Sequence, residues 1–592
     1  MNHRLSQIKI KNYKSIIDET FDLSDYTALV GYNNAGKSNI LSAIKWLLRR
    51  TSLSSDCFNQ TDQPIIIEGK IEGISSTLLQ AMDPGHKTSI EKYITGEVLN
   101  IRQIQNSPGD TVAKIKIEVY DDSNNKYVPN PNGLTEALSV LFPEPIQIGA
   151  MENSEEDVSK SKAGTTIAKL LAEILGPIET QYGMDVKTAL DGVKGLLSAD
   201  GNARVAELTN FDTQVNSKID SFFPGINIKI HIPTPELKEV FNKGTIKVYE
   251  EQILNGRDVS SLGHGAQRSI QMALIQHLAE LKRTNQGFAT NTLLLVDEPE
   301  LYLHPQAIEV VRDSFKKLST QGYQVIFSTH SPMMVTSEDI ATTVLIRKDK
   351  SRGTFARKTL SSAIAKIEKS APSQIELLFS LTNSSQILFS EKIILTEGTT
   401  EQRIIPELVR IETSKTLGLH KCALMSQGGV DNTKKSMDIL CVMDLPVKAI
   451  VDLDYAFRGA IKDGFILAND SDIKVCLGHL KSISTSHNIA LDPGGLPTKK
   501  FANGNSAIPA SDAYEILASE ATIQKNIEAI HNKLLAKNIW VWKTGAIEKP
   551  LGLKLKEEKE WSNFCENVKK NTLDKTAKDA KEIRKCITWL LN

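Results

Sequence analysis

The chain has 592 residues, 40% of them hydrophobic and 24% charged, and its formal net charge is -1 at pH 7. At about 100–200 residues per domain, this length predicts three or four domains of ordinary globular composition. The balanced charge excludes a globally basic field, so any contact with nucleic acid must come from a local patch.

Two features predict a cytoplasmic protein. The chain has no apolar run of about 18 residues, which a membrane-spanning helix would need, and its first residues alternate between apolar and polar like a strand rather than a signal core. The cysteines are scattered and form no CxxC pair, which favours reduced structural thiols over disulfides or a zinc site. They are Cys57, Cys422, Cys441, Cys476, Cys565 and Cys586.

The first α/β block is predicted from alternation and glycine turns. Residues 4–13 indicate a strand, and residues 25–50 indicate a strand, a glycine loop and an amphipathic helix with Ile40, Ile44 and Leu48 on one face. Further strands are predicted at 64–74, 113–122, 225–234 and 244–254, and a helical insertion from about 161 to 222.

A second α/β block runs from 260 to about 350, and residues 359–390 indicate a connector. From 391 to about 550, strands at 391–398, 422–429, 449–456 and 538–545 alternate with helices, and a Lys-rich helical tail ends the chain. The fold class is therefore α/β, with two α/β blocks of different character.

The glycine loop "GYNNAGKS", residues 31–38, fits GxxxxGK[ST] between a strand and a helix. Its glycines allow backbone N–H groups to surround phosphate oxygens at a helix N-terminus. Lys37 would reach the β- and γ-phosphates, and the Ser38 hydroxyl would bind Mg²⁺. The nucleotide-binding residues expected in this loop are Gly31, Asn33, Asn34, Gly36, Lys37, Ser38 and Asn39.

A second motif completes the nucleotide site. In "LLLVDEPELYLHP" a buried parallel strand is predicted to end in Asp297 and Glu298. Asp297 would hold the Mg²⁺ water shell, and Glu298 would polarise the attacking water. The next apolar strand, in "YQVIFSTHSP", leads to His330, which is suited to sensing the γ-phosphate.

The stretch "SSLGHGAQRSIQMALIQHL", residues 260–278, is a glycine turn that opens a helix. With it, the order of motifs resembles that of ABC-type ATPases of the SMC and RecF kind. The resemblance implies that Gly265 and Gln267 belong to a signature loop that caps ATP on the opposite subunit of a dimer, with His264 where a Ser is common. It also implies a Q-loop glutamine, for which Gln60 and Gln63 are both candidates. Without a membrane span, a transporter component is disfavoured.

A cluster of acidic residues stands at later strand ends. "ILTEGTTEQRII" places Glu397 at the end of a strand and Glu401 one helical turn later, and "AIVDLDYA" ends in Asp452 and Asp454. Residues two apart in a strand point to the same side, so both aspartates are expected to face one mouth of the sheet. Converging carboxylates repel each other unless divalent cations neutralise them, and oxygen ligands suit Mg²⁺ or Mn²⁺.

The Glu-Gly strand end, the "GG" turn at Gly428 and Gly429 and the DxD pair resemble a Toprim domain. An ABC-type ATPase followed by Toprim is the layout of the OLD (overcoming lysogenisation defect) family of nucleases, and the chain resembles its class 1 branch. The resemblance implies an ATPase domain in two segments, residues 1–160 and 226–358, separated by a helical dimerisation insertion at residues 161–225. A connector at residues 359–390 and a Toprim nuclease domain with a helical tail, residues 391–592, would complete the chain.

The resemblance also directs attention to "GAIE", where Glu548 follows a strand and a glycine turn. Family members carry a metal-associated acid in such an element, so Glu548 is expected to be a metal ligand. Family nucleases use a lysine near the scissile phosphate as well. Lys543, Lys549, Lys554, Lys578 and Lys581 are all candidates for that role.

The sequence therefore predicts an ATP-hydrolysing, metal-dependent DNA endonuclease, and the resemblance implies a use in phage or foreign-DNA defence. Two Mg²⁺ or Mn²⁺ ions held by Glu397, Glu401, Asp452, Asp454 and Glu548 would activate water and stabilise the leaving 3′ oxygen. Glu401 is favoured for direct metal contact and Glu397 for proton transfer. The alternative is a RecF- or SMC-like DNA-binding repair ATPase with a non-catalytic Toprim docking domain. A homodimer or higher homo-oligomer is expected, and a protein or nucleic-acid regulator could bind the insertion or the tail.

Overall fold

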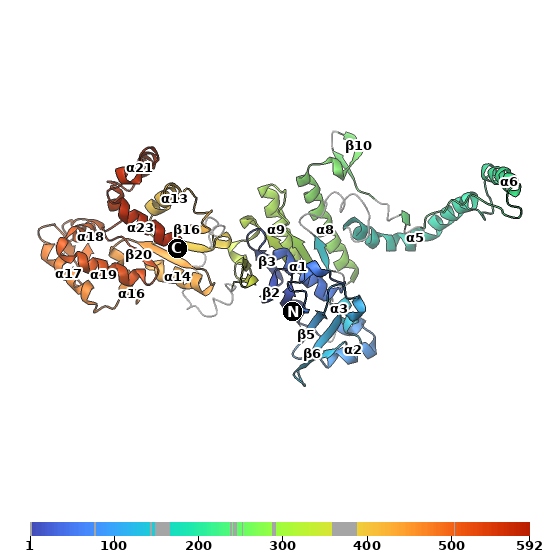
Figure 1. The fold of residues 1–592 in the computed structure, drawn as a ribbon, viewed down its shortest axis with the longest axis horizontal. Coiled ribbons are helices and arrows are strands. Elements are labelled where there is room, and N and C mark those ends of the chain that lie inside the picture. The colour runs from blue at the N-terminus through green and yellow to red at the C-terminus, as the bar shows by residue number, and fades with distance from the viewer. Residues whose placement is uncertain are drawn as a thin grey trace. The chain divides into compact units, whose positions relative to one another are not determined.

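The computed structural model has a mixed α/β fold (Figure 1). It describes residues 3–75, 78–142, 145–148, 166–236, 239–240, 245–250, 253–286, 292–357, 387–501 and 504–592. Most of the predicted connector, residues 359–386, lies outside the described residues. The chain forms two compact units, the first Met1–Lys14, Asp22–Tyr26 and Ser38–Thr329, and the second Ser15–Phe21, Thr27–Lys37 and His330–Asn592. The predicted domain limits stay a prediction.

The first unit contains an antiparallel run of strands in the order β7-β6-β5-β4-β1. Their bounds are β1 Arg4–Tyr13, β4 Ile65–Glu72, β5 Val98–Gln105, β6 Lys116–Asp121 and β7 Lys126–Pro129. Burial alternates strictly along β4 and β5, as expected for strands with one face on the core. The strands predicted at 4–13, 64–74 and 113–122 are confirmed; β5 was not predicted.

The first unit also holds three parallel strands, in the order β12-β11-β8. They are β8 Ile146–Ile148, β11 Thr292–Asp297 and β12 Tyr323–Thr329. Both long strands are buried almost throughout, which is typical of parallel strands covered on both faces. The helices of this body are α1 Lys37–Leu48, α2 Pro84–Glu91, α3 Leu134–Leu141, α8 His264–Gln286 and α9 Pro305–Thr320.

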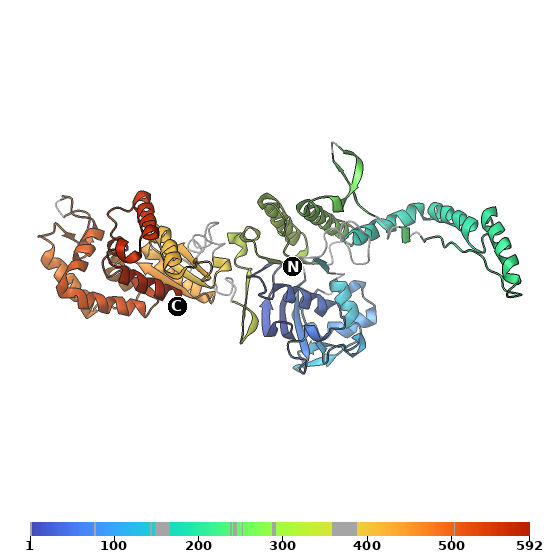
Figure 2. The same cartoon turned by 45° about the horizontal axis from the view of Figure 1, so that its top comes forward.

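The predicted helical insertion forms an arm of two helices, α5 Thr166–Leu197 and α6 Ala206–Asp220 (Figure 1, Figure 2). A hairpin of β9 Lys247–Glu250 and β10 Ile253–Asp258 follows it and confirms the strands predicted at 244–254.

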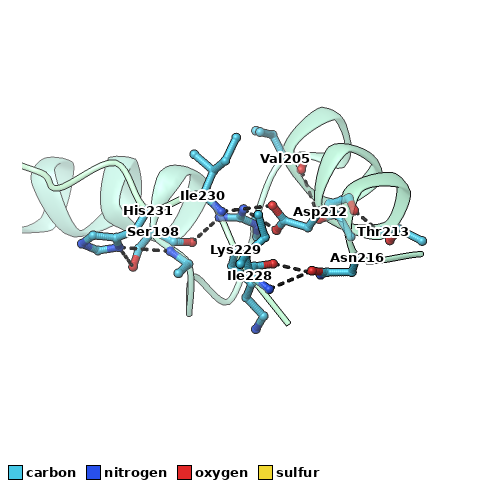
Figure 3. A network of polar contacts seen from close by, with 12 residues as sticks. Ser198, Val205, Asp212, Thr213, Asn216, Ile228, Lys229, Ile230 and His231 are labelled. Atoms are coloured by element: carbon cyan, nitrogen blue, oxygen red, sulfur yellow. Dashed lines mark hydrogen bonds and ion pairs between the residues drawn. The ribbon is translucent and has the colours of Figure 1, made fainter. Parts of the chain in front are cut away.

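The strand predicted at 225–234 is wrong. This extended segment lies against the two arm helices, and the close view shows its contacts (Figure 3). The Asn216 side chain bonds to both backbone groups of Ile228, and Asp212 accepts from the Ile230 N–H. Since side chains of a helix satisfy this backbone, the alternating isoleucines pair with no other strand in the described residues.

In the second unit, four strands follow the order β2-β14-β13-β3. They are β2 Ile16–Asp22, β3 Tyr26–Val30, β13 Val344–Asp349 and β14 Gly353–Ala356, with β13 parallel to β3 and antiparallel to β14. The β3 strand leads directly into the glycine loop, so the sheet fixes where that loop begins.

The rest of the second unit contains a parallel four-stranded sheet in the order β16-β15-β17-β20. Its strands are β15 Lys392–Thr396, β16 Cys422–Ser426, β17 Val447–Val451 and β20 Ile539–Val541. In register, Thr396 pairs with Ser426 and with Ile450, and Val451 pairs with Val541. The carboxyl ends of all four strands therefore meet at one edge.

Helices cover this sheet. The amphipathic helix α13 Thr399–Thr413 buries Ile404, Ile405, Leu408 and Val409 in a core shared with α21 Glu558–Lys570 and α23 Ala580–Leu591. The other helices are α14 Thr433–Val442, α15 Asp454–Phe457, α16 Gly459–Lys462, α17 Ser471–Ile483, α18 Ala510–Ser519, α19 Gln524–Leu535, α20 Glu548–Leu551 and α22 Leu573–Thr576, and a small hairpin pairs β18 Ala490–Leu491 with β19 Pro497–Thr498. The predicted helical tail is thus confirmed.

All six cysteines are free in the structure. Within the described residues, no helix is long and apolar enough to cross a membrane.

Candidate active sites

The glycine loop is built around a buried lysine. Lys37 Nζ donates to the carbonyls of Gly31 at 3.1 Å and Tyr32 at 3.3 Å, and it lies 2.8 Å from His330 Nε2. The predicted phosphate-binding lysine and the predicted switch histidine are therefore neighbours. Two of the other predicted residues, Asn33 and Asn34, are exposed in the loop.

The loop conformation depends on Gly36, which has a φ of +102°. A Cβ at this position would collide with the side chain of Thr354 on β14. The Thr354 hydroxyl donates to the Ala35 carbonyl at 2.8 Å, so β14 supports the loop from below. The loop then enters α1, where Ser38 is exposed and Asn39 is half-buried.

The two predicted acidic residues, Asp297 at the end of β11 and Glu298 directly after it, are held by β12. Ser328 Oγ donates to Asp297 Oδ1, and the Glu298 N–H bonds to Ser328 as well. Glu298 has a φ of 47°, a left-handed conformation that costs energy for a residue with a side chain. Such strain is often found at functional residues, so it agrees with the catalytic role predicted for Glu298.

The signature helix α8 is tied to the same strand end by a residue that the sequence pattern did not single out. The buried Arg268 donates to the carbonyls of Asp297 at 3.3 Å and Glu298 at 3.2 Å, and also to Gln271 Oε1 at 2.6 Å. Its place within "GAQRS" was its only signal. Arg268 couples the start of the helix to the acidic pair.

The predicted signature residues shape the loop before α8. Gln267 is buried and donates to the Leu262 carbonyl at 2.8 Å. Gly265 lies where a Cβ would approach the Tyr302 carbonyl to 2.8 Å, and the His264 ring lies 5.2 Å from the Tyr302 ring. Gly265 therefore permits close packing against the loop that follows Glu298.

The two Q-loop candidates are not separated by the structure. Gln60 and Gln63 are both exposed, and Gln63 Nε2 donates to Gln60 Oε1 at 2.5 Å. Asn12 Nδ2 donates to the carbonyls of both residues. The assignment of the Q-loop glutamine stays open.

The second cluster lies at the carboxyl edge of the four-stranded sheet. Glu397 directly follows β15 and Glu401 lies in the first turn of α13, while Asp452 directly follows β17. Glu548 begins α20 after the turn that leaves β20. Residues from three parallel strands thus converge because their strand ends share one edge.

One detail of this prediction is wrong. Asp452 and Asp454 are not both strand residues, because β17 ends at Val451 and Asp454 already begins α15. The chain turns at Leu453, whose N–H donates to the Gly545 carbonyl at 2.7 Å. That bond joins the DxD turn to the turn before Glu548, so helical rather than strand geometry sets where Asp454 lies.

Direct contacts connect the cluster. The Asp452 N–H donates to Glu397 Oε2 at 3.3 Å, and Thr400 Oγ1 donates to Glu548 Oε1 at 2.7 Å. Asp452 Oδ1 and Asp454 Oδ1 are buried and accept no hydrogen bond from any described residue.

Burial and mutual repulsion raise the pKa of these carboxyls. Loss of hydration raises the pKa of Glu397 to about 7, helped by the charge of Asp454. Loss of hydration likewise raises the pKa of Glu401 to about 7, with Glu548 adding repulsion. Burial also raises the pKa of Asp452 and of Asp454 above its usual value. The cluster therefore holds more negative charge than its surroundings stabilise.

A lysine outside the set of sequence candidates faces the cluster. Lys556 Nζ lies 3.3 Å from Glu548 Oε2 and 3.7 Å from Asp452 Oδ2. Burial lowers the pKa of Lys556, but the charges of Asp452 and Glu548 outweigh it, and the net pKa is raised. Two of the candidate lysines are engaged elsewhere, Lys543 with Glu528 and Lys549 with Glu515. Spacing alone could not distinguish Lys556, because it lies in an irregular loop two residues after Lys554.

The donor set fits divalent cations. It offers carboxylate oxygens only, and two of them, Asp452 Oδ1 and Asp454 Oδ1, are buried without a donor among the described residues. Across the ranges that the structure describes, no three acidic, histidine or cysteine side chains already lie close enough together to hold an ion. Bound ions would therefore have to draw the carboxylates closer together.

Comparison with known proteins gives two family matches. Residues 26–336 match the family "AAA domain, putative AbiEii toxin, Type IV TA system", and residues 388–454 match "Overcoming lysogenization defect protein-like, TOPRIM domain". The chain is 37% identical, over the full length of both proteins, to the Old nuclease of Escherichia phage P2. It is 22% identical to the OLD nuclease of Thermus scotoductus, covering 79% of this chain and 82% of that protein. It is 24% identical to the endonuclease GajA of Bacillus cereus, covering 76% and 75%.

Proposed function

The chain belongs to the OLD nuclease family, and on that premise we propose that its TOPRIM carboxylates cleave DNA with two divalent ions under the control of its ATPase domain. One observation carries the proposal. The acidic residues lie at one edge of a parallel sheet, and buried oxygens of Asp452 and Asp454 have no hydrogen-bond donor among the described residues. A buried, unneutralised carboxylate is costly, so this arrangement favours a cation site over a docking surface.

The residues of the cluster divide into ion ligands, a proton-transfer group and a phosphate-binding lysine. Glu401, Asp452, Asp454 and Glu548 hold the ions, and Glu397, with a pKa of about 7, is suited to accept or donate a proton near neutral pH. Lys556 faces the carboxylates and would bind the scissile phosphate. Bound Mg²⁺ or Mn²⁺ would supply an activated water and charge stabilisation for the leaving oxygen.

The ATPase domain is proposed to use the nucleotide motifs in their usual roles. Lys37 would leave His330 and bind the β- and γ-phosphates, while Ser38 and Asp297 would hold Mg²⁺. Glu298 would orient the attacking water. Arg268 bonds to the backbone carbonyls of Asp297 and Glu298. A shift of the signature helix would therefore move the backbone of Glu298, the residue that orients the attacking water.

A homodimer is proposed, because the resemblance to SMC- and RecF-type ATPases implies that the signature loop acts on ATP in a second copy. The arm offers a surface for the pairing. Phe222 is 78% exposed, Phe223 is 65% exposed, and Ile226 beside them is exposed too. Clustered exposed aromatic and aliphatic side chains are typical of protein interfaces.

The biological role proposed is defence against phage or other foreign DNA. Its support is the family, since the relatives include the Old nuclease of Escherichia phage P2 and the endonuclease GajA of Bacillus cereus.

The test is incubation of supercoiled plasmid with the full-length protein and Mg²⁺ or Mn²⁺, with ATP hydrolysis measured on the same preparations. Wild type should nick the plasmid, and Glu401→Gln and Asp452→Asn should not, while both variants still hydrolyse ATP. Lys37→Ala should lose ATP hydrolysis. Cleavage by the carboxylate variants at the wild-type rate, or no cleavage by wild type, would reject the nuclease assignment.

A further inference from the structure

The side chain of Thr400 lies between the helix α13 and the metal-site residue Glu548. Thr400 is only 2% exposed and Glu548 5%, and the hydroxyl donates to Glu548 Oε1 at 2.7 Å across 148 residues of sequence. A serine or threonine hydroxyl carries a single proton, so the whole donor capacity of Thr400 is spent on this carboxylate.

The contact determines how Glu548 presents its second oxygen. With Oε1 occupied by Thr400, Oε2 faces the cluster and lies 3.3 Å from Lys556 Nζ. Without the hydroxyl, no other described residue would hold Oε1, and the carboxylate could turn both oxygens toward the lysine.

The surrounding structure fixes Thr400 as well. It occupies the first turn of α13, next to Glu401, and the same helix is anchored by Ile404 and Ile405 in the domain core. Glu401 and Thr400 are therefore positioned by the same helix. One acts on the site with its own carboxylate, and the other acts through Glu548.

We propose that Thr400 is a positioning residue that orients Glu548 for divalent-metal binding. The inference rests on the proposed nuclease site. Partners that orient a metal ligand typically account for about 10–100-fold in metal affinity, so removal of the hydroxyl should weaken binding by that factor.

The experiment is titration calorimetry of full-length, nucleotide-free protein with Mn²⁺. Thr400→Val keeps the shape and loses the donor, so its Mn²⁺ affinity should fall about 10–100-fold while the melting temperature of the metal-free protein stays close to that of wild type. Thr400→Ser keeps the donor and should bind within about threefold of wild type. Thr399→Val, an exposed threonine one residue earlier on the same helix, is the matched control and should bind like wild type.

Each outcome decides the question. Equal Mn²⁺ affinity for Thr400→Val and wild type overturns the inference and leaves the nuclease proposal standing. A loss in Thr400→Ser as large as that in Thr400→Val also overturns it, because a retained hydroxyl would then fail to orient Glu548. If wild type binds no Mn²⁺, the metal site itself is wrong and both ideas fall. Should the valine variant not fold, Thr400→Ala against Thr400→Ser makes the same comparison.

Discussion

Metal binding should release protons from the carboxylate cluster near neutral pH. Glu397 and Glu401 each have a pKa of about 7 because burial removes their hydration. Each is therefore about half protonated at pH 7. A bound cation needs the ionised form of Glu401, and its positive charge beside Glu397 favours the ionised form of that carboxyl as well. The two residues alone should release about one proton per protein at pH 7, rising to about 1.8 at pH 6 and falling to about 0.2 at pH 8. Asp452, whose pKa is also raised, adds to this release.

The assay is calorimetric titration of Mg²⁺ or Mn²⁺ in pairs of buffers with different ionisation enthalpies, at pH 6, 7 and 8. The slope of observed enthalpy against buffer enthalpy gives the number of protons released. Glu397→Gln should lower the release at pH 7 by about half a proton. Glu407→Gln is the control on the same helix, because ion pairs with Arg410 and Lys569 hold the pKa of Glu407 below its usual value.

The same pKa shifts determine whether the stability of the folded protein rises or falls with pH. The ordinary pKa of a glutamate is 4.5, and the folded protein raises it to about 7 at Glu397 and Glu401. Between these two pH values, the folded protein holds more protons on the two residues than the unfolded chain does. The contribution of these residues to the stability of the metal-free protein must therefore decrease as pH rises through that window, and metal should restore it. Release of fewer than about 0.3 protons at pH 7 would refute the reasoning, because the carboxyls would then already be ionised.

Three other predictions follow from individual contacts. Lys556→Met should lower plasmid cleavage at least about 100-fold without loss of ATP hydrolysis. Lys554→Met, two residues away, should retain cleavage. Equal loss in both variants would contradict the assignment of Lys556 to the scissile phosphate. Gly545→Ala should lower the melting temperature, because φ is +106° and the new Cβ would lie 2.8 Å from Glu515 Cγ; Gly478→Ala, in open space on α17, should stabilise by up to about 1 kcal/mol. The double variant Phe222→Lys/Phe223→Lys should weaken dimerisation at least about tenfold, as measured by analytical ultracentrifugation. Leu419→Lys, at another exposed apolar residue, should not weaken it. A double variant that still dimerises like wild type would exclude Phe222 and Phe223 from the dimer interface.

Sequence pattern predicted most of the carboxylate cluster, and the reason is topological. Glu397 and Asp452 each follow an apolar strand, and parallel strands bring their carboxyl ends to one edge of a sheet. The position of Glu548 required the family resemblance, because a short turn with Gly545 separates it from β20. Local periodicity contains no information about where such a turn points.

The errors have physical causes of the same kind. The alternating segment 225–234 has a strand pattern, but Asn216 and Asp212 take its backbone hydrogen bonds, so no strand ladder forms in the described residues. Lys556 lies on an irregular loop, and only the folded chain shows that it, rather than Lys543 or Lys549, faces the acids. Tertiary hydrogen bonds determine the conformation of segment 225–234, and tertiary ion pairs determine which lysine faces the acids. The local spacing of residues in the sequence does not reveal either kind of contact.

The central claim is that the carboxylates at the edge of the TOPRIM sheet hold divalent ions. Its most direct test is a crystal of the full-length protein soaked in Mn²⁺, with diffraction collected near the manganese absorption edge. Two anomalous peaks are predicted among Glu397, Glu401, Asp452, Asp454 and Glu548, with ligand distances of about 2.1–2.3 Å. An anomalous map with no peak at this edge, under conditions in which the protein cuts DNA, would contradict the account.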